Sequence, residues 1–69
     1  MDYIEFGKRV RILRKRMKLT QEELAELVDV SHSFIGHIER GTRKLSVDTL
    51  FRLCAVLKTS ADELIGLKK

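Results

Sequence analysis

The fold of this chain is decided by residues 20–41, which read TQEELAELVDVSHSFIGHIERG. The first part predicts a short helix over residues 21–28, because Thr20 and Glu23 have the spacing of a capping box. The apolar face of this helix is formed by Leu24, Leu27 and Val28. Residues 29–31 then break the helical pattern, so the stretch opens with one helix and a tight turn.

A second helix follows the turn over residues 32–40, with Ser31 as its N-cap and Gly41 as the residue that ends it. Its inward positions are Phe34, Ile35 and Ile38. Its outward positions, none of them acidic or large and apolar, are His32, Ser33, Gly36, His37 and Arg40. Two short helices joined by a tight turn form a helix-turn-helix, a unit that places its second helix in the major groove of DNA. The pattern therefore predicts a recognition helix at residues 32–40.

The rest of the chain predicts three further helices, each after a capping residue. They cover residues 3–17 after Asp2, residues 47–57 after Ser46, and a short segment to about residue 65 after Ser60. Glu5 and Glu63 stand where they would complete capping boxes. No segment alternates with the period of a strand. The sequence therefore predicts an all-α protein, a compact five-helix bundle in which residues 1–69 form a single domain.

Composition narrows the classes of function. The chain has 69 residues, a formal charge of +4 and an isoelectric point near 9.6, which favours a polyanionic partner. One cysteine, Cys54, excludes an internal disulfide and sits on a predicted core face, so we expect an inert thiol and a cytoplasmic location. No apolar run is long enough for a membrane span or a signal peptide. His32 and His37 have no further ligands at metal-binding spacing, and no nucleophile–base pair appears, so we expect no metal, no cofactor and no enzymatic activity.

Basic side chains gather in two places. The first cluster, on the N-terminal helix and just after it, is Lys8, Arg9, Arg11, Arg14, Lys15, Arg16 and Lys18. A solvated helix face explains that cluster as well as a nucleic-acid contact does. The second cluster is Arg40, Arg43 and Lys44, and it flanks the outward face of the predicted recognition helix, where phosphates would run.

These motifs together resemble the phage repressor and Cro family of helix-turn-helix proteins, also called the XRE family. The resemblance rests on Gly7, Arg9-Val10, Leu13-Arg14, the run Leu19–Ala25, Val30-Ser31, Ile35, Ile38–Gly41 and Leu50–Leu57. It covers nearly the whole chain and implies a fold like the DNA-binding domain of the lambda repressor. It also implies sequence-specific binding of double-stranded DNA by a transcriptional regulator.

The resemblance implies roles for individual residues. Base edges would be contacted from His32, Ser33, Gly36 and His37, and phosphates from Gln21, Arg40, Thr42, Arg43 and Lys44. Arg14 and Glu39 match a partly buried ion pair that ties the first helix to the end of the third, and their apolar neighbours also place both at the edge of the core.

The chain departs from the family pattern at three positions. Lys18 replaces a common glycine, which costs on the order of 1 kcal/mol if the backbone there is left-handed. Leu45 stands where relatives often carry proline, so this side chain is expected to pack or to leave the loop looser. Gly36 replaces a small polar residue and would let the backbone approach DNA closely.

We expect a homodimer on a palindromic operator-like site, because one module of this size buries too little surface for tight specific binding. The C-terminal residues Leu64, Ile65 and Leu67 are the first candidates for the interface, and Ile4 and Ile12 are the second. Two alternatives remain open at this point. In the first, the chain is an antitoxin or accessory DNA-binding subunit that acts with a partner protein. In the second, it is a helical interaction module without DNA binding.

Overall fold

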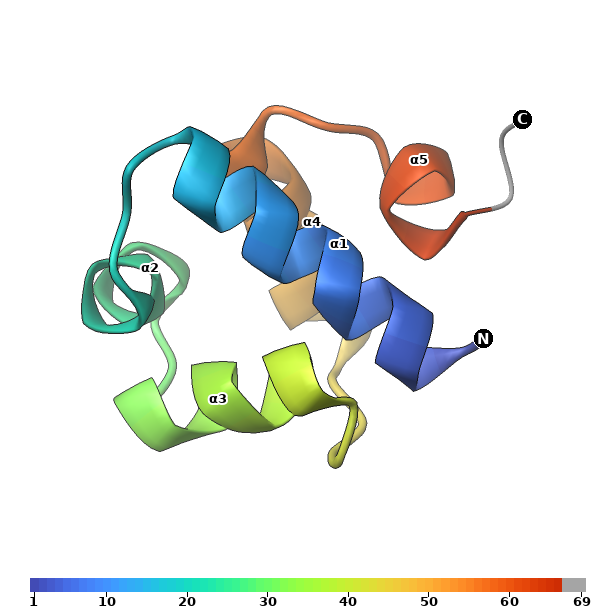
Figure 1. Ribbon diagram of the computed structural model, residues 1–69, viewed down its shortest axis with the longest axis horizontal. Helices are drawn as coiled ribbons and strands as arrows, with labels where there is room; N and C mark the ends of the chain where they lie inside the picture. The colour runs from blue at the N-terminus through green and yellow to red at the C-terminus, as the bar shows by residue number, and fades with distance from the viewer. Residues whose placement is uncertain (67–69) are drawn as a thin grey trace.

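The computed structural model describes residues 1–66, which form five helices packed around one core (Figure 1). The helices are α1 (Tyr3–Arg16), α2 (Gln21–Val28), α3 (His32–Arg40), α4 (Val47–Leu57) and α5 (Ala61–Ile65). In Figure 1, α1 crosses the front of the molecule, α4 lies behind it, α3 runs below, and α5 lies at the right. The predicted all-α architecture is confirmed, and the helix bounds agree with the predicted ones to within one residue.

Every helix begins at a side chain that accepts a hydrogen bond from the first turn. These N-cap residues are Asp2, Thr20, Ser31, Ser46 and Ser60. Both halves of the capping box form at Thr20 and Glu23. The other two predicted capping boxes were only partly right. Asp2 and Ser60 accept hydrogen bonds from the first turn, but Glu5 and Glu63 do not accept one from the backbone amide of the N-cap residue. Glu5 pairs with Lys8 at 3.2 Å instead, and Glu63 accepts from the Ser60 hydroxyl rather than from its backbone amide.

The core takes side chains from all five helices. Its buried apolar members are Phe6, Val10, Leu24, Ala25, Val28, Ile35, Ile38, Leu53, Cys54, Leu57 and Leu64. Leu45 packs against this core, which is one of the two outcomes expected for it in place of proline. Leu27 is the exception to the predicted pattern on α2, because its side chain is 57% exposed while Leu24 and Val28 are buried. Helical periodicity placed Leu27 near the apolar face, but α3 and α4 pack against the other side of α2.

Three helices end at residues with a left-handed backbone that are not glycine. The φ angles are 59° at Lys18, 61° at Asp29 and 55° at Lys58. Lys18, where relatives commonly carry glycine, has the left-handed backbone on which the predicted cost of about 1 kcal/mol depends. Asp29 forms the turn between α2 and α3, and a short polar side chain tolerates this conformation better than lysine does.

The position of α5 contradicts the predicted dimer interface at one residue, Leu64. Leu64 is completely buried in the core of its own chain, and Ile65 is half-buried against the same core. Leu67 lies outside the described residues. Leu64 is not available to a second copy, because α5 packs on α1 and α4 and encloses this side chain. The rest of the predicted interface stays a prediction. Among residues 1–66, no helix is both long and apolar enough to cross a bilayer.

Candidate nucleic-acid interface

The outward face of α3 exposes the two side chains at its start. His32 and Ser33 are exposed, and His37, one turn further on, is half-buried. Acidic side chains are absent from this face because Glu39 turns inward, towards α1. A short helix with small polar and imidazole side chains outward can enter the major groove without a charge clash.

Gly36 lies in the middle of this face, but it is not open to solvent. The backbone there is buried, and a methyl group at this position would lie 3.0 Å from a guanidinium nitrogen of Arg40. The Arg40 side chain, one turn along α3, therefore folds back over Gly36. Arg40 thus covers the backbone at Gly36, and a close approach of DNA to this backbone, which stays a prediction, would require Arg40 to move outward.

Thr42 contacts the ring of His37 and orients it. The two side chains are joined by a 2.8 Å contact between Nδ1 of His37 and Oγ1 of Thr42, and the same hydroxyl donates to the His37 carbonyl at 3.3 Å. With that donation made, Oγ1 accepts from Nδ1, so the proton of a neutral ring is assigned to Nδ1. The other ring nitrogen, Nε2, is then left as an acceptor.

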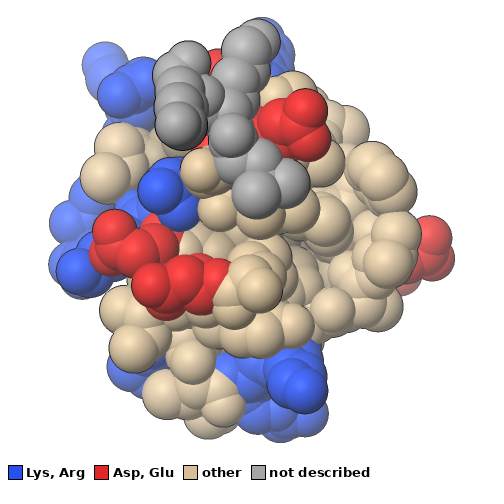
Figure 2. Space-filling model, turned by 90° about the vertical axis from the view of Figure 1, so that its right-hand side faces the viewer, with Lys and Arg blue, Asp and Glu red and all other residues tan. Residues whose placement is uncertain are grey.

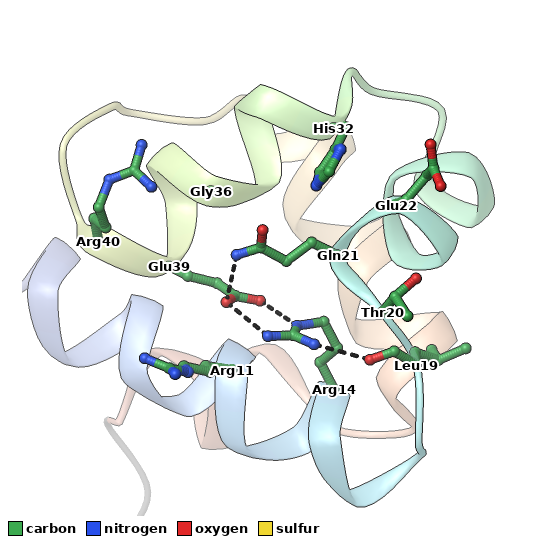
Figure 3. Close-up of a pocket in the computed structure, with 10 residues that line it drawn as sticks. All are labelled: Arg11, Arg14, Leu19, Thr20, Gln21, Glu22, His32, Gly36, Glu39 and Arg40. Carbon is green, nitrogen blue, oxygen red and sulfur yellow. Dashed lines mark hydrogen bonds and ion pairs between the residues drawn. The ribbon is translucent and has the colours of Figure 1, made fainter.

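A buried ion pair fixes the end of α3 to α1. Arg14 donates from Nε to Oε2 of Glu39 at 2.6 Å and from Nη2 to Oε1 at 3.1 Å, and its third nitrogen donates to the carbonyl of Leu19 at 2.8 Å. The side chains of Arg14 and Glu39 are only 9% and 4% exposed. Gln21, at the start of α2, donates to Oε1 of Glu39 at 3.1 Å. The pair thus links three helices (Figure 3).

Close contact between backbones supports the same junction. A Cβ atom on Gly7 would overlap the carbonyl oxygens of Ile38 and Glu39, so only glycine lets α1 lie this close to α3. This contact holds the last turn of α3 in place beside α1. The end of α3 is therefore held in place by residues of α1 that lie far from it in the sequence.

An open groove of about 730 Å³ lies between α1, the start of α2 and α3 (Figure 3). Its lining includes Gln21, His32 and Gly36, and Arg11 and Arg40 supply its exposed cations. Glu22 also lines it, in the first turn of α2, where the helix dipole favours an acid. The groove thus offers guanidinium and amide donors to an anionic ligand.

The basic loop that follows α3 is held by an aromatic ring. The guanidinium carbon of Arg43 lies 5.5 Å from the centre of the Phe34 ring, the geometry of a cation–π contact. Phe34 itself is half-buried against the core, as expected. Arg43 and Lys44 are exposed, so both charges remain available to a partner.

Three comparisons with known proteins agree with this geometry. Residues 10–64 match the family of helix-turn-helix proteins described as HTH_3. The chain belongs to this family. It is 42% identical over 59 residues to the uncharacterized HTH-type transcriptional regulator YazB of Bacillus subtilis, covering 86% of each chain. The predicted membership of the phage repressor-like family is therefore confirmed.

Two solved structures of helix-turn-helix proteins have the same fold. The restriction-modification controller protein C.AhdI of Aeromonas hydrophila has a TM-score of 0.85 and 38% identity, with 91% of this chain and 96% of that chain covered. The P22 c2 repressor in complex with a synthetic operator has a TM-score of 0.82 and 34% identity, with 86% and 89% covered. The chain is thus a transcriptional regulator of the helix-turn-helix family, and the prediction that it is not an enzyme is confirmed.

Sequence reasoning missed one member of the site in this helix-turn-helix protein. Arg11 lies in the first basic cluster, which a solvated face explained equally well, yet it lines the groove together with Arg40. Helical periodicity alone placed it on the outside of α1. No group of three or more potential metal ligands occurs within residues 1–66. Burial raises the pKa of the Cys54 thiol, in keeping with its place in the core.

Proposed function

We propose that this chain reads double-stranded DNA with α3 in the major groove and holds phosphates with the basic side chains beside and after that helix. The observation that carries the proposal is the arrangement of charge around α3. Its outward face is free of acidic side chains, and it lies between the groove that contains Arg11 and Arg40 and the loop that contains Arg43 and Lys44. Phosphates flank the major groove on both sides, so cations close to the helix that enters the groove can bind them.

Base recognition falls to three side chains in this proposal. His32 and Ser33 are exposed at the start of α3, the end that approaches base edges in helix-turn-helix proteins. His37 would accept a hydrogen bond at Nε2, because Thr42 engages Nδ1. The amino groups of adenine and cytosine are the donors that the major groove offers to such an acceptor.

Phosphate binding is proposed for the donors around these side chains. One amide proton of Gln21 is bound to Glu39, which aims the amide group and leaves its second proton for a phosphate at the groove. Arg40 would exchange its place over Gly36 for a phosphate oxygen, and Arg43 and Lys44 act as exposed charges on the loop. Thr42 contributes indirectly, since its hydroxyl is already bound to His37.

A second copy completes the proposed complex. One copy presents a recognition helix of nine residues, which spans only a few base pairs. Two copies on half-sites about one helical turn apart would double the contacts and read a palindrome. The relative with a solved operator complex, the P22 c2 repressor, shows that this fold supports operator binding in that protein.

Selection of bound sequences from a random DNA pool tests the proposal. We expect a palindromic motif from the wild-type chain. His32→Ala and His37→Ala should each change the preferred base at one or two positions, by about 1–3 kcal/mol per base pair. Lys8→Ala, on the outer side of α1, is the control and should return the wild-type motif. Recovery of no motif, or of an unchanged motif from both histidine variants, would contradict the assignment of α3.

A further inference from the structure

Helices α1 to α4 end in the same backbone geometry. After each of them a residue has a left-handed backbone, and the next residue donates its N–H to the carbonyl five positions earlier. The donor and acceptor residues are Leu19 and Arg14, Val30 and Ala25, Thr42 and His37, and Thr59 and Cys54, at 3.0–3.1 Å. Each helix end therefore brings together two residues that are five positions apart.

The end of α3 differs from the others in what these two residues carry. Among the four helix ends, all within residues 1–66, only this one joins the two side chains by a hydrogen bond, between Oγ1 of Thr42 and Nδ1 of His37 at 2.8 Å. The end of α4 has a threonine at the same position, Thr59, but its partner position holds Cys54. The contact between a hydroxyl and an imidazole ring is thus a feature that the sequence adds to a common helix end.

The backbone holds Thr42 beside the ring. Gly41 has a φ of 73°, and it lies so close to α1 that a Cβ atom there would be 2.7 Å from the Cα atom of Ile4. The backbone N–H of Thr42 is bound to the carbonyl of His37 at 3.0 Å. Threonine is branched at Cβ, which restricts its side chain to few rotamers. The position of the hydroxyl therefore does not depend on its contact with the ring.

The hydroxyl of Thr42 has one proton, so it can donate only one strong hydrogen bond. It donates to the carbonyl of His37 at 3.3 Å, which leaves Oγ1 to accept from Nδ1. Within residues 1–66 this hydroxyl is the sole hydrogen-bond partner of the ring. In Figure 2 the lower edge of the molecule, the level at which α3 lies in Figure 1, shows basic and uncharged side chains, and the acidic ones lie higher. The choice of the protonated nitrogen therefore falls to Thr42.

We propose that Thr42 determines which base His37 reads, because it selects the tautomer of the ring; this proposal rests on the proposed function. With the proton on Nδ1, Nε2 accepts a hydrogen bond, and adenine and cytosine offer amino groups to it. With the proton on Nε2, the same ring would donate instead, and guanine offers the acceptors N7 and O6. Thr42 thus acts as a positioning residue that sets the base preference without touching a base.

A phosphate contact from Thr42 predicts a different result. Phosphate contacts position a protein on DNA and carry no direct sequence information. Loss of the hydroxyl would then weaken binding to all sequences alike. Loss of a group that selects the tautomer changes the order in which the bases are preferred, so the two roles can be told apart by measurement.

Nitrogen-15 NMR of the imidazole rings tests the tautomer without DNA. The measurement is made at about pH 8.5, above the range in which histidine normally takes up a proton. In the wild-type chain the proton should lie on Nδ1 of His37, and His32→Ala assigns the signals. Thr42→Val keeps the branched shape and removes the hydroxyl, so the proton should move to Nε2. Thr42→Ser restores the hydroxyl and should return the proton to Nδ1. A wild-type proton on Nε2, or a tautomer unchanged in Thr42→Val, overturns the proposal.

Selection from a random DNA pool tests the base preference. His37→Ala identifies the position that His37 reads. At that position Thr42→Val should favour guanine, and its affinity for the wild-type motif should fall by about tenfold. Thr59→Val is the matched control, since it removes a threonine hydroxyl at the same position after α4, and it should return the wild-type motif. Thr42→Ala replaces Thr42→Val in both experiments if that variant fails to fold by circular dichroism.

The remaining outcomes separate this proposal from the proposed function. An equal loss of affinity for all sequences in Thr42→Val, or an unchanged motif, overturns the role of Thr42 in base preference. A motif changed equally by Thr59→Val overturns it as well. Failure of the wild-type chain to select any DNA overturns the proposed function, and with it the base preference, whereas the NMR result still decides whether Thr42 sets the tautomer of His37.

Discussion

The buried pair of Arg14 and Glu39 gives the sharpest test of how this fold is held together. Replacing Glu39 with glutamine keeps the shape of the side chain but leaves the Arg14 guanidinium buried without its counter-charge. Breaking a buried pair by removing one partner costs about 3–5 kcal/mol. A chain of 69 residues has a total stability of roughly 3–10 kcal/mol at about 0.05–0.15 kcal/mol per residue. The change therefore removes a large share of the stability.

Thermal unfolding followed by circular dichroism measures the effect. For a domain of this length each kcal/mol lowers Tm by about 4–8 °C, so Glu39→Gln should lower Tm by more than about 12 °C. Lys8→Ala is the control, because it breaks the exposed pair of Lys8 and Glu5 and should change stability by less than about 1 kcal/mol. The contrast between the two variants isolates burial from the mere presence of an ion pair.

Replacing both partners separates the pair from the packing around it. Arg14→Met combined with Glu39→Leu removes both charges, so no buried charge remains unpaired. The double variant should be more stable than Glu39→Gln alone, although the Leu19 carbonyl and the Gln21 amide each lose a partner. A double variant as unstable as the single one, or a Glu39→Gln variant within about 1 kcal/mol of the wild type, would refute the argument from burial.

Three other predictions follow from single contacts. Lys18→Gly should raise the free energy of unfolding by about 0.5–1 kcal/mol, because Lys18 has a φ of 59°, and urea denaturation measures this gain; no gain would mean that the left-handed backbone carries no strain. Arg43→Ala and Lys44→Ala should each weaken binding to all DNA sequences alike and reduce the slope of affinity against salt by about one unit; a changed base preference would contradict the phosphate role. The Cys54 thiol should react with an alkylating reagent at pH 8 far more slowly in the native chain than in urea, because burial raises its pKa, and equal rates would show that it is accessible.

Local signals in the sequence were enough to predict the helices. Each of the five N-caps is a short polar side chain next to an apolar helical pattern, and this chemistry acts within three residues of the chain. Gly41, with a φ of 73°, ends α3 in the left-handed conformation that glycine adopts without strain. Such features depend on neighbouring residues alone, so a single sequence contains them.

The direction of side chains on short helices could not be predicted in the same way. Leu64 and Ile65 are adjacent on α5, a helix of five residues, and periodicity over so short a length does not define an inner face. The docking of α5 on α1 decides the matter. Arg9 donates to the carbonyl of Ile65 at 3.5 Å, and its guanidinium lies against Gly66, so Leu64 turns into the core. That contact joins residues 56 positions apart, which no local pattern reveals.

The candidate site shows the same division between local and distant causes. The outward face of α3 follows from helical periodicity, whereas the groove beside it takes Arg11, Gln21 and Arg40 from three different helices. Gly36 is the clearest case, because sequence alone gave it a role towards DNA, and the structure gives it one towards Arg40. Because position 36 has no side chain, the guanidinium of Arg40 can lie on the helix backbone and keep its charge on the outward face of α3. Gly36 thus allows the Arg40 charge to lie close to where a phosphate would bind in the proposed complex. The free energy needed to move Arg40 outward would then lower the affinity for DNA.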